Sequence, residues 1–263
     1  MIVSSNPAFF NAGSPAGSRG PYVPISTNDL RIWLDASFNS TRVVNNNFVN
    51  AWKFSKPTSG QASSTGISIP ITNTNLINGK SVVTWDDIGD DALVVLPTSN
   101  EADLFANGGT AFFALRAASK GGGAGQTGYI YSKTQHSFFL SNTDAESAAL
   151  SFTQEFSTSD GSWQTAENNI EFTETAIITL QYNSSVVTNV PTIRINGFTQ
   201  GVNFVSSPSG TAVSDVTSSL HLGNSSQRNQ GFHGDFAEVI WYKRSLSLSE
   251  ISDHEQYLSD KWE

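Results

Sequence analysis

Short apolar runs separated by turn residues begin near Leu30 and continue to the end of the chain. This spacing is typical of a β-sandwich. Residues 1–27 carry Gly, Pro and Ser without periodicity, which indicates an extended arm before one domain over residues 28–263. The runs predict strands at Leu30–Ala36, Ala51–Phe54, Ser81–Trp85, Ala92–Pro97, Thr110–Ala117, Tyr129–Lys133, Ser137–Ser141, Ala149–Phe156, Ala176–Tyr182, Thr192–Ile195, Phe198–Gly201, Ser219–Leu222 and Gly231–Lys243.

One hairpin is predicted with particular clarity. Asn196-Gly197 stands between the alternating residues Ile193–Ile195 and the run that begins at Phe198. A type I′ turn requires positive φ at both central residues, and Asn-Gly tolerates this conformation.

An amphipathic helix is predicted at the C-terminus, over about Leu248 to Lys261. Ser247 and Glu250 have the spacing of a capping box, in which each side chain bonds the other's backbone amide. An apolar stripe follows, so one helix face can pack on a sheet. The stripe consists of Leu248, Ile251, Leu258 and Trp262.

Composition excludes several functions. Lys and Arg number 14 against 23 Asp and Glu, which gives a net charge of −9, and the arginines are scattered singly. Nucleic-acid binding needs a basic stripe, so the chain is not expected to bind nucleic acid. It has no cysteine, which excludes thiol catalysis, thiolate metal sites and disulfides.

No targeting or membrane segment is expected. The N-terminus lacks both a basic start and an apolar run of the length that a secretory signal needs. No stretch approaches the roughly 18 apolar residues that span a bilayer, so we expect no signal peptide and no membrane insertion.

Several short motifs resemble one family of domains. Leu30–Ala36 resembles its opening "LWLDA" strand, and Asn78–Asp86 resembles its "NGK…V.FD" segment. Ile193–Gly197 and Leu220–Gly223 resemble "LYVNG" and "L.IG". Together with the closing segment from residue 232 to residue 262, these motifs resemble the laminin G-like, concanavalin A-like lectin/glucanase domains of phage virion and bacterial surface proteins. The resemblance covers residues 28–263 and implies an all-β fold, with two antiparallel sheets in jelly-roll order and one face or loop rim available for binding.

Aromatic residues are the first candidate chemistry, because sugars stack on indole and phenol rings. Trp163 lies in a polar stretch with Asp160 and Gln164, which makes this trio the candidate ligand-binding site, with Trp163 as the exposed ring. The alternative is that Trp163 plugs a sheet edge. The other tryptophans are expected in the core: Trp33, Trp52, Trp85, Trp241 and Trp262.

Four carboxylates cluster at Asp86, Asp87, Asp90 and Asp91, and they could supply oxygen ligands to calcium. Their adjacent pairs depart from the alternating ligands of an EF-hand loop, and no closing glutamate follows. The alternative is a solvated hairpin turn between two strands. No other cofactor is indicated.

Enzyme chemistry finds little support. A retaining glycosidase needs two carboxylates about 5–5.5 Å apart, whereas the spacing of Glu171 and Glu174 puts them on opposite faces of a strand. No serine lies in a Gly-x-Ser-x-Gly elbow, and the four histidines show no metal spacing. His233, near Asp235, is expected to have a structural role.

The favoured interpretation is a non-enzymatic bacteriophage virion protein, namely a capsid decoration, fibre or tail-associated adhesin. It would be made in the host cytoplasm, attach to other virion proteins through its N-terminal arm, and bind a host surface glycan or a neighbouring virion protein. A homotrimer would bring several arms to one anchor point. An exported bacterial carbohydrate-binding module is the alternative, and a polysaccharide hydrolase ranks behind both.

Overall fold

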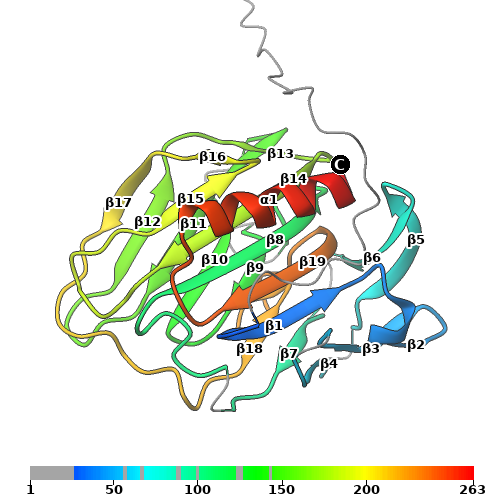
Figure 1. Cartoon of the computed structure of the whole chain (residues 1–263), viewed down its shortest axis with the longest axis horizontal. Coiled ribbons are helices and arrows are strands. Elements are labelled where there is room, and N and C mark those ends of the chain that lie inside the picture. Colours follow the sequence, from blue (N-terminus) through cyan, green and yellow to red (C-terminus); the bar gives the residue numbers. More distant parts are fainter. Residues whose placement is uncertain are drawn as a thin grey trace, which may run out of the picture.

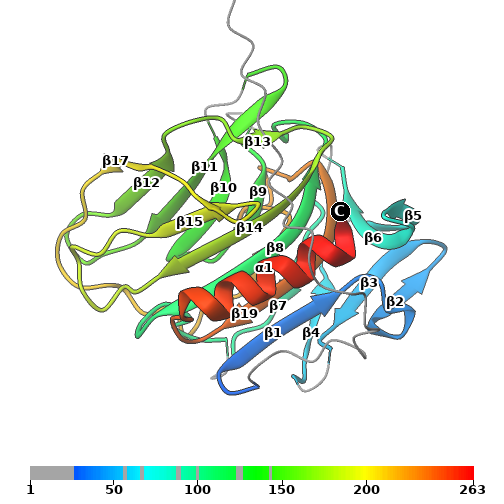
Figure 2. The same cartoon turned by 45° about the horizontal axis from the view of Figure 1, so that its top comes forward.

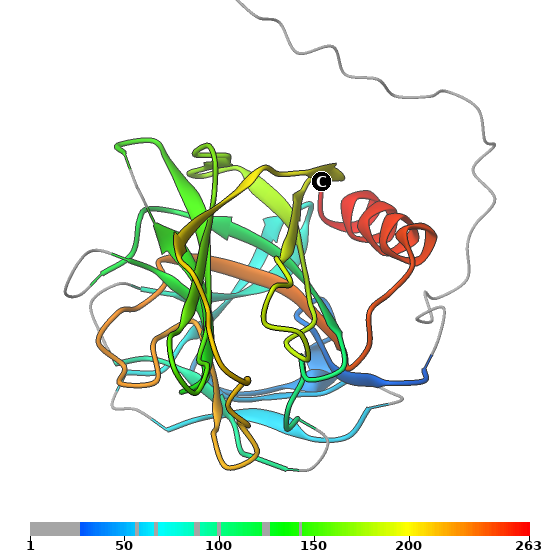
Figure 3. The same ribbon diagram turned by 90° about the vertical axis from the view of Figure 1, so that its left-hand side faces the viewer.

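The computed structural model describes residues 27–55, 58–65, 68–86, 90–98, 101–122, 127–141 and 144–263. In this part of the chain two antiparallel sheets are stacked, and one helix lies against the outer face of one of them (Figure 1; Figure 3). The predicted all-β sandwich with a C-terminal helix is therefore confirmed. The N-terminal arm, apart from Thr27, lies outside the described residues.

The sheet next to the helix, called the helix-side sheet, is built around β19 (Gly234–Tyr242). One edge of β19 pairs with β8 along its whole length, and the other edge is shared by β1 and β6. The remaining strands extend outward from β8 and β6. The sheet thus contains β1 (Leu30–Asp35), β5 (Ile71–Ile77), β6 (Lys80–Trp85), β8 (Gly109–Ala117), β14 (Thr175–Tyr182), β15 (Thr192–Ile195) and β16 (Phe198–Thr199) beside β19.

The second sheet, called the back sheet, lies on the side away from the helix. Its strand pairs are all antiparallel. In spatial order they are β2 (Arg42–Asn45), β3 (Phe48–Lys53), β4 (Gln61–Ser64), β7 (Leu93–Val95), β18 (Leu220–Leu222), β9 (Tyr129–Ser132), β10 (His136–Ser141), β11 (Ser147–Gln154), β12 (Gly161–Thr165) and β17 (Val202–Ser206). The short β13 (Ile170–Glu171) pairs with the start of β11, and a 3₁₀ turn, Asn39–Thr41, precedes β2.

The main core fills the space between the sheets. Trp241 lies near its middle, with ring centroids 4.8 Å from Tyr131, 5.4 Å from Phe105 and 6.3 Å from Phe113. The prediction that five tryptophans are core residues is confirmed, since none is more than 5% exposed: Trp33, Trp52, Trp85, Trp241 and Trp262.

The helix α1 (Leu248–Trp262) has the predicted capping box. Ser247 N donates to the Glu250 carboxylate at 2.8 Å, and Glu250 N donates back to Ser247 Oγ at 3.3 Å. A second apolar cluster joins Ile251, Leu258 and Trp262 to the outer face of the helix-side sheet, along which α1 lies in Figure 2. Leu248 was wrongly included in the buried stripe: it is 64% exposed, because it is the first helical residue and lies beyond the sheet contact. No helix in the described ranges is long and apolar enough to cross a membrane.

The predicted hairpin is also present. Asn196 and Gly197 have φ of 48° and 81°, and Ile195 pairs with Phe198 across the turn. Six strands were not predicted from the sequence: β2, β4, β5, β12, β13 and β17. β4, β5, β12 and β17 are rich in Ser, Thr, Asn and Gln, whose composition suggests loops, and β2 and β13 are only four and two residues long.

Candidate functional site

The outer face of the back sheet carries a row of mostly polar side chains, of which Val94, Ser132 and Ser137 are buried. Side chains alternate between the faces of a strand, so residues next to core residues such as Leu222, Tyr131 and Phe138 point outward. The strand registers place these residues side by side across the sheet. The row consists of Ser63, Val94, His221, Ser132, Ser137, Thr153 and Ser162.

A second row runs beside the first and contains two aromatic rings. Tyr129 and Phe139 are half-buried and stack with ring centroids 4.8 Å apart and planes inclined by 17°. Phe139 pairs with Ser151, which pairs with Gln164, which pairs with Asn203 on the edge strand β17. The two rows together are called the polar face.

Hydrogen bonds hold the floor of the polar face. Ser137 Oγ and Thr153 Oγ1 are 2.6 Å apart, and Ser141 Oγ and Ser151 Oγ are also 2.6 Å apart. Gln164 Nε2 donates to Ser141 Oγ at 2.8 Å. These contacts fix the Gln164 amide, and its carbonyl oxygen lies on the same outer face.

The polar face is uncharged. Neither row contains Asp, Glu, Lys or Arg. Burial raises the pKa of the Tyr129 hydroxyl, although a hydrogen bond with Ser137 opposes this, so the hydroxyl stays neutral. Burial, together with the nearby Arg228 charge, lowers the pKa of His221, and its Nδ1 has no hydrogen-bond partner among the described residues. The face therefore offers hydroxyl, amide and imidazole groups beside aromatic surface.

One predicted site residue lies on the polar face and two do not. Gln164 belongs to its second row. Asp160 is exposed in the turn before β12, where its Oδ1 accepts from Phe156 N at 3.1 Å and its carbonyl accepts from Ser206 Oγ. The other residues of the polar face were not predicted, because Ser and Thr that alternate with apolar residues also occur in loops and carry no binding motif.

The prediction that Trp163 is an exposed ring is wrong. Trp163 is 0% exposed and lies on β12 between the outward residues Ser162 and Gln164. Its indole stacks on Phe152 at 5.8 Å and covers Gly161, where an added Cβ would meet the ring at 2.2 Å. The polar neighbours that suggested a loop are the outward half of a strand.

Asp86 and Asp91 lie where the chain passes from β6 in the helix-side sheet to β7 in the back sheet. The solvated-hairpin interpretation is wrong, because β6 pairs with β5 and β19 whereas β7 pairs with β4 and β18. Asp91 is only 2% exposed, and burial, reinforced by the Asp86 charge, raises its pKa to about 7.

The calcium interpretation stays a prediction. Asp87 lies outside the described residues, while Asp90 accepts a hydrogen bond from Ser68 N at 3.0 Å. Among the described residues no group of three or more His, Asp or Glu side chains has an arrangement that could hold a metal ion.

Glu171 and Glu174 do not share a strand. β13 ends at Glu171, the chain turns at Thr173 with φ of 71°, and β14 begins at Thr175. The two glutamates instead line one open cavity of about 640 Å³ together with Arg116. Arg116 is bound to Asp235 at 2.7 Å, and His233 Nδ1 lies 2.8 Å from Ser119 Oγ.

A buried charged cluster lies next to the β9–β10 turn and consists of Lys133, His136 and Asp215. Lys133 Nζ lies 2.7 Å from Asp215 Oδ1, and His136 Nε2 lies 2.8 Å from Asp215 Oδ2. Lys133 Nζ also donates to the Glu101 carbonyl at 2.8 Å. These contacts connect the β9–β10 turn to two long loops, which is a structural role.

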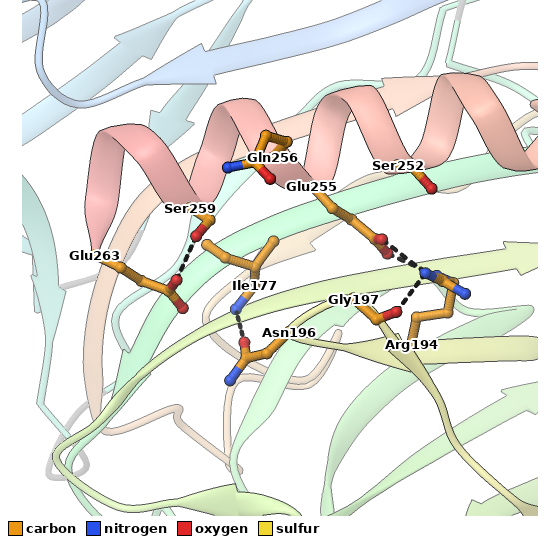
Figure 4. Close-up of a pocket in the computed structure, with 9 residues that line it drawn as sticks. All are labelled: Ile177, Arg194, Asn196, Gly197, Ser252, Glu255, Gln256, Ser259 and Glu263. Carbon is orange, nitrogen blue, oxygen red and sulfur yellow. Dashed lines mark hydrogen bonds and ion pairs between the residues drawn. The ribbon is translucent and has the colours of Figure 1, made fainter. Parts of the chain in front are cut away.

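A cavity of about 240 Å³ lies between α1 and the β15–β16 hairpin (Figure 4). Arg194 binds the Glu255 carboxylate through two nitrogens, at 2.8 and 2.9 Å, and also donates to Gly197 O. Asn196 Oδ1 accepts from Ile177 N at 2.8 Å, and the Glu263 carboxylate accepts from Ser259 Oγ. The Arg194–Glu255 contacts hold the helix against the hairpin.

Solved structures share this fold. The chain is similar to the binding domain of Paraclostridial Mosquitocidal Protein 1, with a TM-score of 0.58 and 14% identity over 87% of this chain and 52% of that one. It is also similar to a structure of botulinum neurotoxin type C, whose cell entry is dependent upon interaction with two ganglioside molecules, with a TM-score of 0.53 and 11% identity over 88% and 51% of the two chains. The chain thus spans about half the length of these two chains.

A third similar structure matches almost end to end. Domain 4 of AbnA, an extracellular arabinanase from Geobacillus stearothermophilus in complex with arabinotriose, has a TM-score of 0.50 and 14% identity over 86% of this chain and 97% of that one. Neither a protein-family model nor a curated protein sequence matches the chain. The fold is concanavalin A-like, as the sequence motifs predicted.

Proposed function

We propose that this protein is a non-enzymatic glycan-binding protein of a bacteriophage virion, and that the polar face of the back sheet binds an uncharged glycan. The observation that carries the proposal is the chemistry of this face. It combines hydroxyls, the Gln164 amide and the Tyr129–Phe139 pair without a single carboxylate or basic side chain apart from the neutral His221.

Neutral sugars are bound through such groups. Their hydroxyls exchange hydrogen bonds with amides, hydroxyls and imidazoles, and their C–H faces pack on aromatic rings. A charged glycan would lose its hydration on this face without gaining an opposite charge, which is unfavourable. The expected ligand is therefore a neutral polysaccharide or glycan chain.

The similar structures support glycan binding as the function of this fold. One is in complex with arabinotriose, and the cell entry of another depends on gangliosides. Because identity is 11–14%, this support concerns the fold, and the ligand class is argued from the polar face itself.

We also propose that the protein is not an enzyme. Glycoside hydrolysis requires a proton donor and a nucleophile or base on either side of the scissile bond, usually two carboxyl groups. The polar face offers no carboxyl group, and Glu171 and Glu174 lie away from it at the β13–β14 turn. A sugar bound there would have no acid–base pair beside it.

The virion location is supported by the resemblance of the closing strand and helix to domains of phage virion proteins. Mass spectrometry of purified particles from the source phage tests it directly. Peptides of this chain in particles that withstand gradient purification are expected, and their absence would contradict the virion role while leaving glycan binding intact.

Glycan binding is tested on an array with the purified full chain. Phe139→Ala and Gln164→Ala are expected to lower the affinity for any bound neutral glycan by about tenfold each, since each removes a direct contact. Gln256→Ala, on the exposed side of α1, is the matched control and should bind like the wild type. Equal binding by all variants would place the glycan elsewhere.

The second candidate is an exported bacterial carbohydrate-binding module. It is favoured by the near-complete overlap with domain 4 of an extracellular arabinanase. Binding to a plant-type polysaccharide, combined with absence from phage particles, would support it over the virion role.

A further inference from the structure

The strand β17 forms one margin of the back sheet, at the left of Figure 1. One edge pairs with β12 through Thr165–Val202, Gln164–Asn203 and Trp163–Phe204. Within the described ranges no strand pairs with its other edge, so a row of backbone N–H and C=O groups faces outward there. An edge of this kind is a template for another strand.

This edge carries neither charge nor proline. Charged residues and proline are two of the features that keep natural edge strands from pairing with other chains. Here no Asp, Glu, Lys, Arg or His occurs from residue 195 to residue 214, and the nearest proline, Pro208, follows the strand.

The edge also exposes apolar surface. Phe204 is 53% exposed and Val205 is 63% exposed. The register with β12 shifts between Ser162 and Trp163, so Val205 is the extra residue of a bulge and stands beside Phe204 at the end of the regular pairing. Burying these side chains would add to the backbone hydrogen bonds of a strand pair.

We propose that β17 pairs antiparallel with β17 of a second copy of this chain across a two-fold axis. The net charge of −9 makes copies repel over most of their surface, so a neutral edge is where they can approach. Because the same strand serves both copies, the contact closes at a dimer.

The opposite margin of the back sheet is a poorer partner. β2 (Arg42–Asn45) is four residues long and carries the Arg42 charge. A β17–β2 contact would also join two different surfaces, so it would build a ring or a filament and not a two-fold dimer.

The dimer itself does not depend on the proposed glycan binding, but one consequence rests on it. β17 carries Asn203, the last residue of the second row of the polar face. Pairing across the two-fold axis would place two polar faces side by side in one continuous sheet, which would let one long glycan contact both copies.

The test is the molar mass of the full-length protein by light scattering and sedimentation over a range of concentrations. The wild type is expected to be a dimer. Val205→Lys should weaken the dimer at least about tenfold, because it places a charged side chain of each copy in the apolar part of the contact, where the charge would lose its hydration. Val216→Lys, at a 51% exposed position off the edge, and Val44→Lys, on β2, are matched controls and should leave it intact.

The outcomes separate the alternatives. A wild type that is monomeric or trimeric overturns the proposal, as does equal dissociation by Val44→Lys. Melting curves of each variant show whether it folds, and the monomeric Val205→Lys should still bind single glycans on the array, so failure of the dimer and failure of glycan binding are distinguishable.

Cross-linking gives a second measurement. The chain has no cysteine, so Val205→Cys introduces a single thiol. Mild oxidation should yield disulfide-linked dimers of Val205→Cys and none of the exposed control Val44→Cys. Equal cross-linking of both, or of neither, contradicts the proposed contact.

Discussion

Asp91 is a carboxylic acid buried where the chain crosses from β6 to β7. Asn224 Nδ2 donates to its backbone carbonyl at 3.0 Å, but its Oδ1 has no hydrogen-bond partner among the described residues. Burial and the negative charge of Asp86 raise its pKa to about 7. The folded protein therefore binds a proton here that the unfolded chain has already released near neutral pH.

This linkage predicts a pH effect on stability. When a carboxyl has a higher pKa in the folded protein than in the unfolded chain, the protein loses stability as pH rises from the unfolded pKa, near 4, to the folded pKa, near 7. Asp91→Asn removes the ionisation. As pH rises from 5 to 8, the free energy of unfolding of Asp91→Asn, measured in urea, should increase by on the order of 3 kcal/mol relative to that of the wild type.

The control for this prediction is calcium. If the aspartates held the ion, calcium would stabilise wild type, and the carboxylate rather than the acid would be the favoured form. A calcium-dependent rise in melting temperature that Asp91→Asn abolishes would contradict the pH prediction and support the metal site.

Trp163 shows how a single ring organises the edge of the core. It contacts Phe152 and Tyr182, with centroids 5.8 and 5.3 Å away, and is fully buried. Trp163→Ala should lower the free energy of unfolding by about 3–5 kcal/mol, because it leaves a large cavity. Denaturant unfolding measures this. A variant as stable as wild type that only loses a ligand would show that the ring has a binding role instead.

At the scale of elements, α1 is attached to the helix-side sheet by a buried polar cluster. Glu238 on β19 is 0% exposed and accepts from Trp33 Nε1 at 2.7 Å, Trp262 Nε1 at 2.9 Å and Lys261 Nζ at 2.7 Å. Lys261 Nζ also contacts the buried Asp35 carboxylate. Burial and the Asp35 charge raise the pKa of Glu238, and the Lys261 ammonium opposes this.

Lys261→Met should therefore destabilise the protein by about 3–5 kcal/mol, because it leaves two buried carboxylates without a counter-charge. Lys53→Met, at an exposed position, is the matched control and should have little effect. Adding Glu238→Gln to Lys261→Met should recover part of the loss, as thermal melting would show. No recovery would mean that packing of the lysine chain, rather than charge, provides the stability.

At the scale of the whole molecule, net charge governs association. Two copies at −9 repel each other, and salt screens this repulsion with a Debye length of about 8–10 Å at physiological ionic strength. Raising NaCl from low to high concentration should therefore tighten the β17 dimer. Sedimentation at both concentrations checks this, and dissociation in high salt would indicate ion pairs in the interface.

Local patterns predicted much of the fold. The capping box at Ser247 and Glu250 and the Asn196-Gly197 turn depend on residues within a few positions of each other, so their chemistry is complete in the sequence. The longer apolar strands, such as β8 and β19, are buried on both faces and stand out by composition alone. Strands rich in Ser and Thr, such as β12, do not, because alternating polar residues also occur in loops.

The sequence by itself determined the sandwich class, the C-terminal helix, the hairpin and the burial of five tryptophans, because these follow from periodicity and turn chemistry. Only the tertiary structure decided the site. Tyr129 and Phe139 lie on neighbouring strands, whereas Gln164 joins them through the register of β10, β11 and β12. The tertiary structure also decided that Asp91 is buried and that, among the described residues, one edge of β17 has no paired strand. Pairing between distant strands sets which side chains share a face, and no local pattern contains that information.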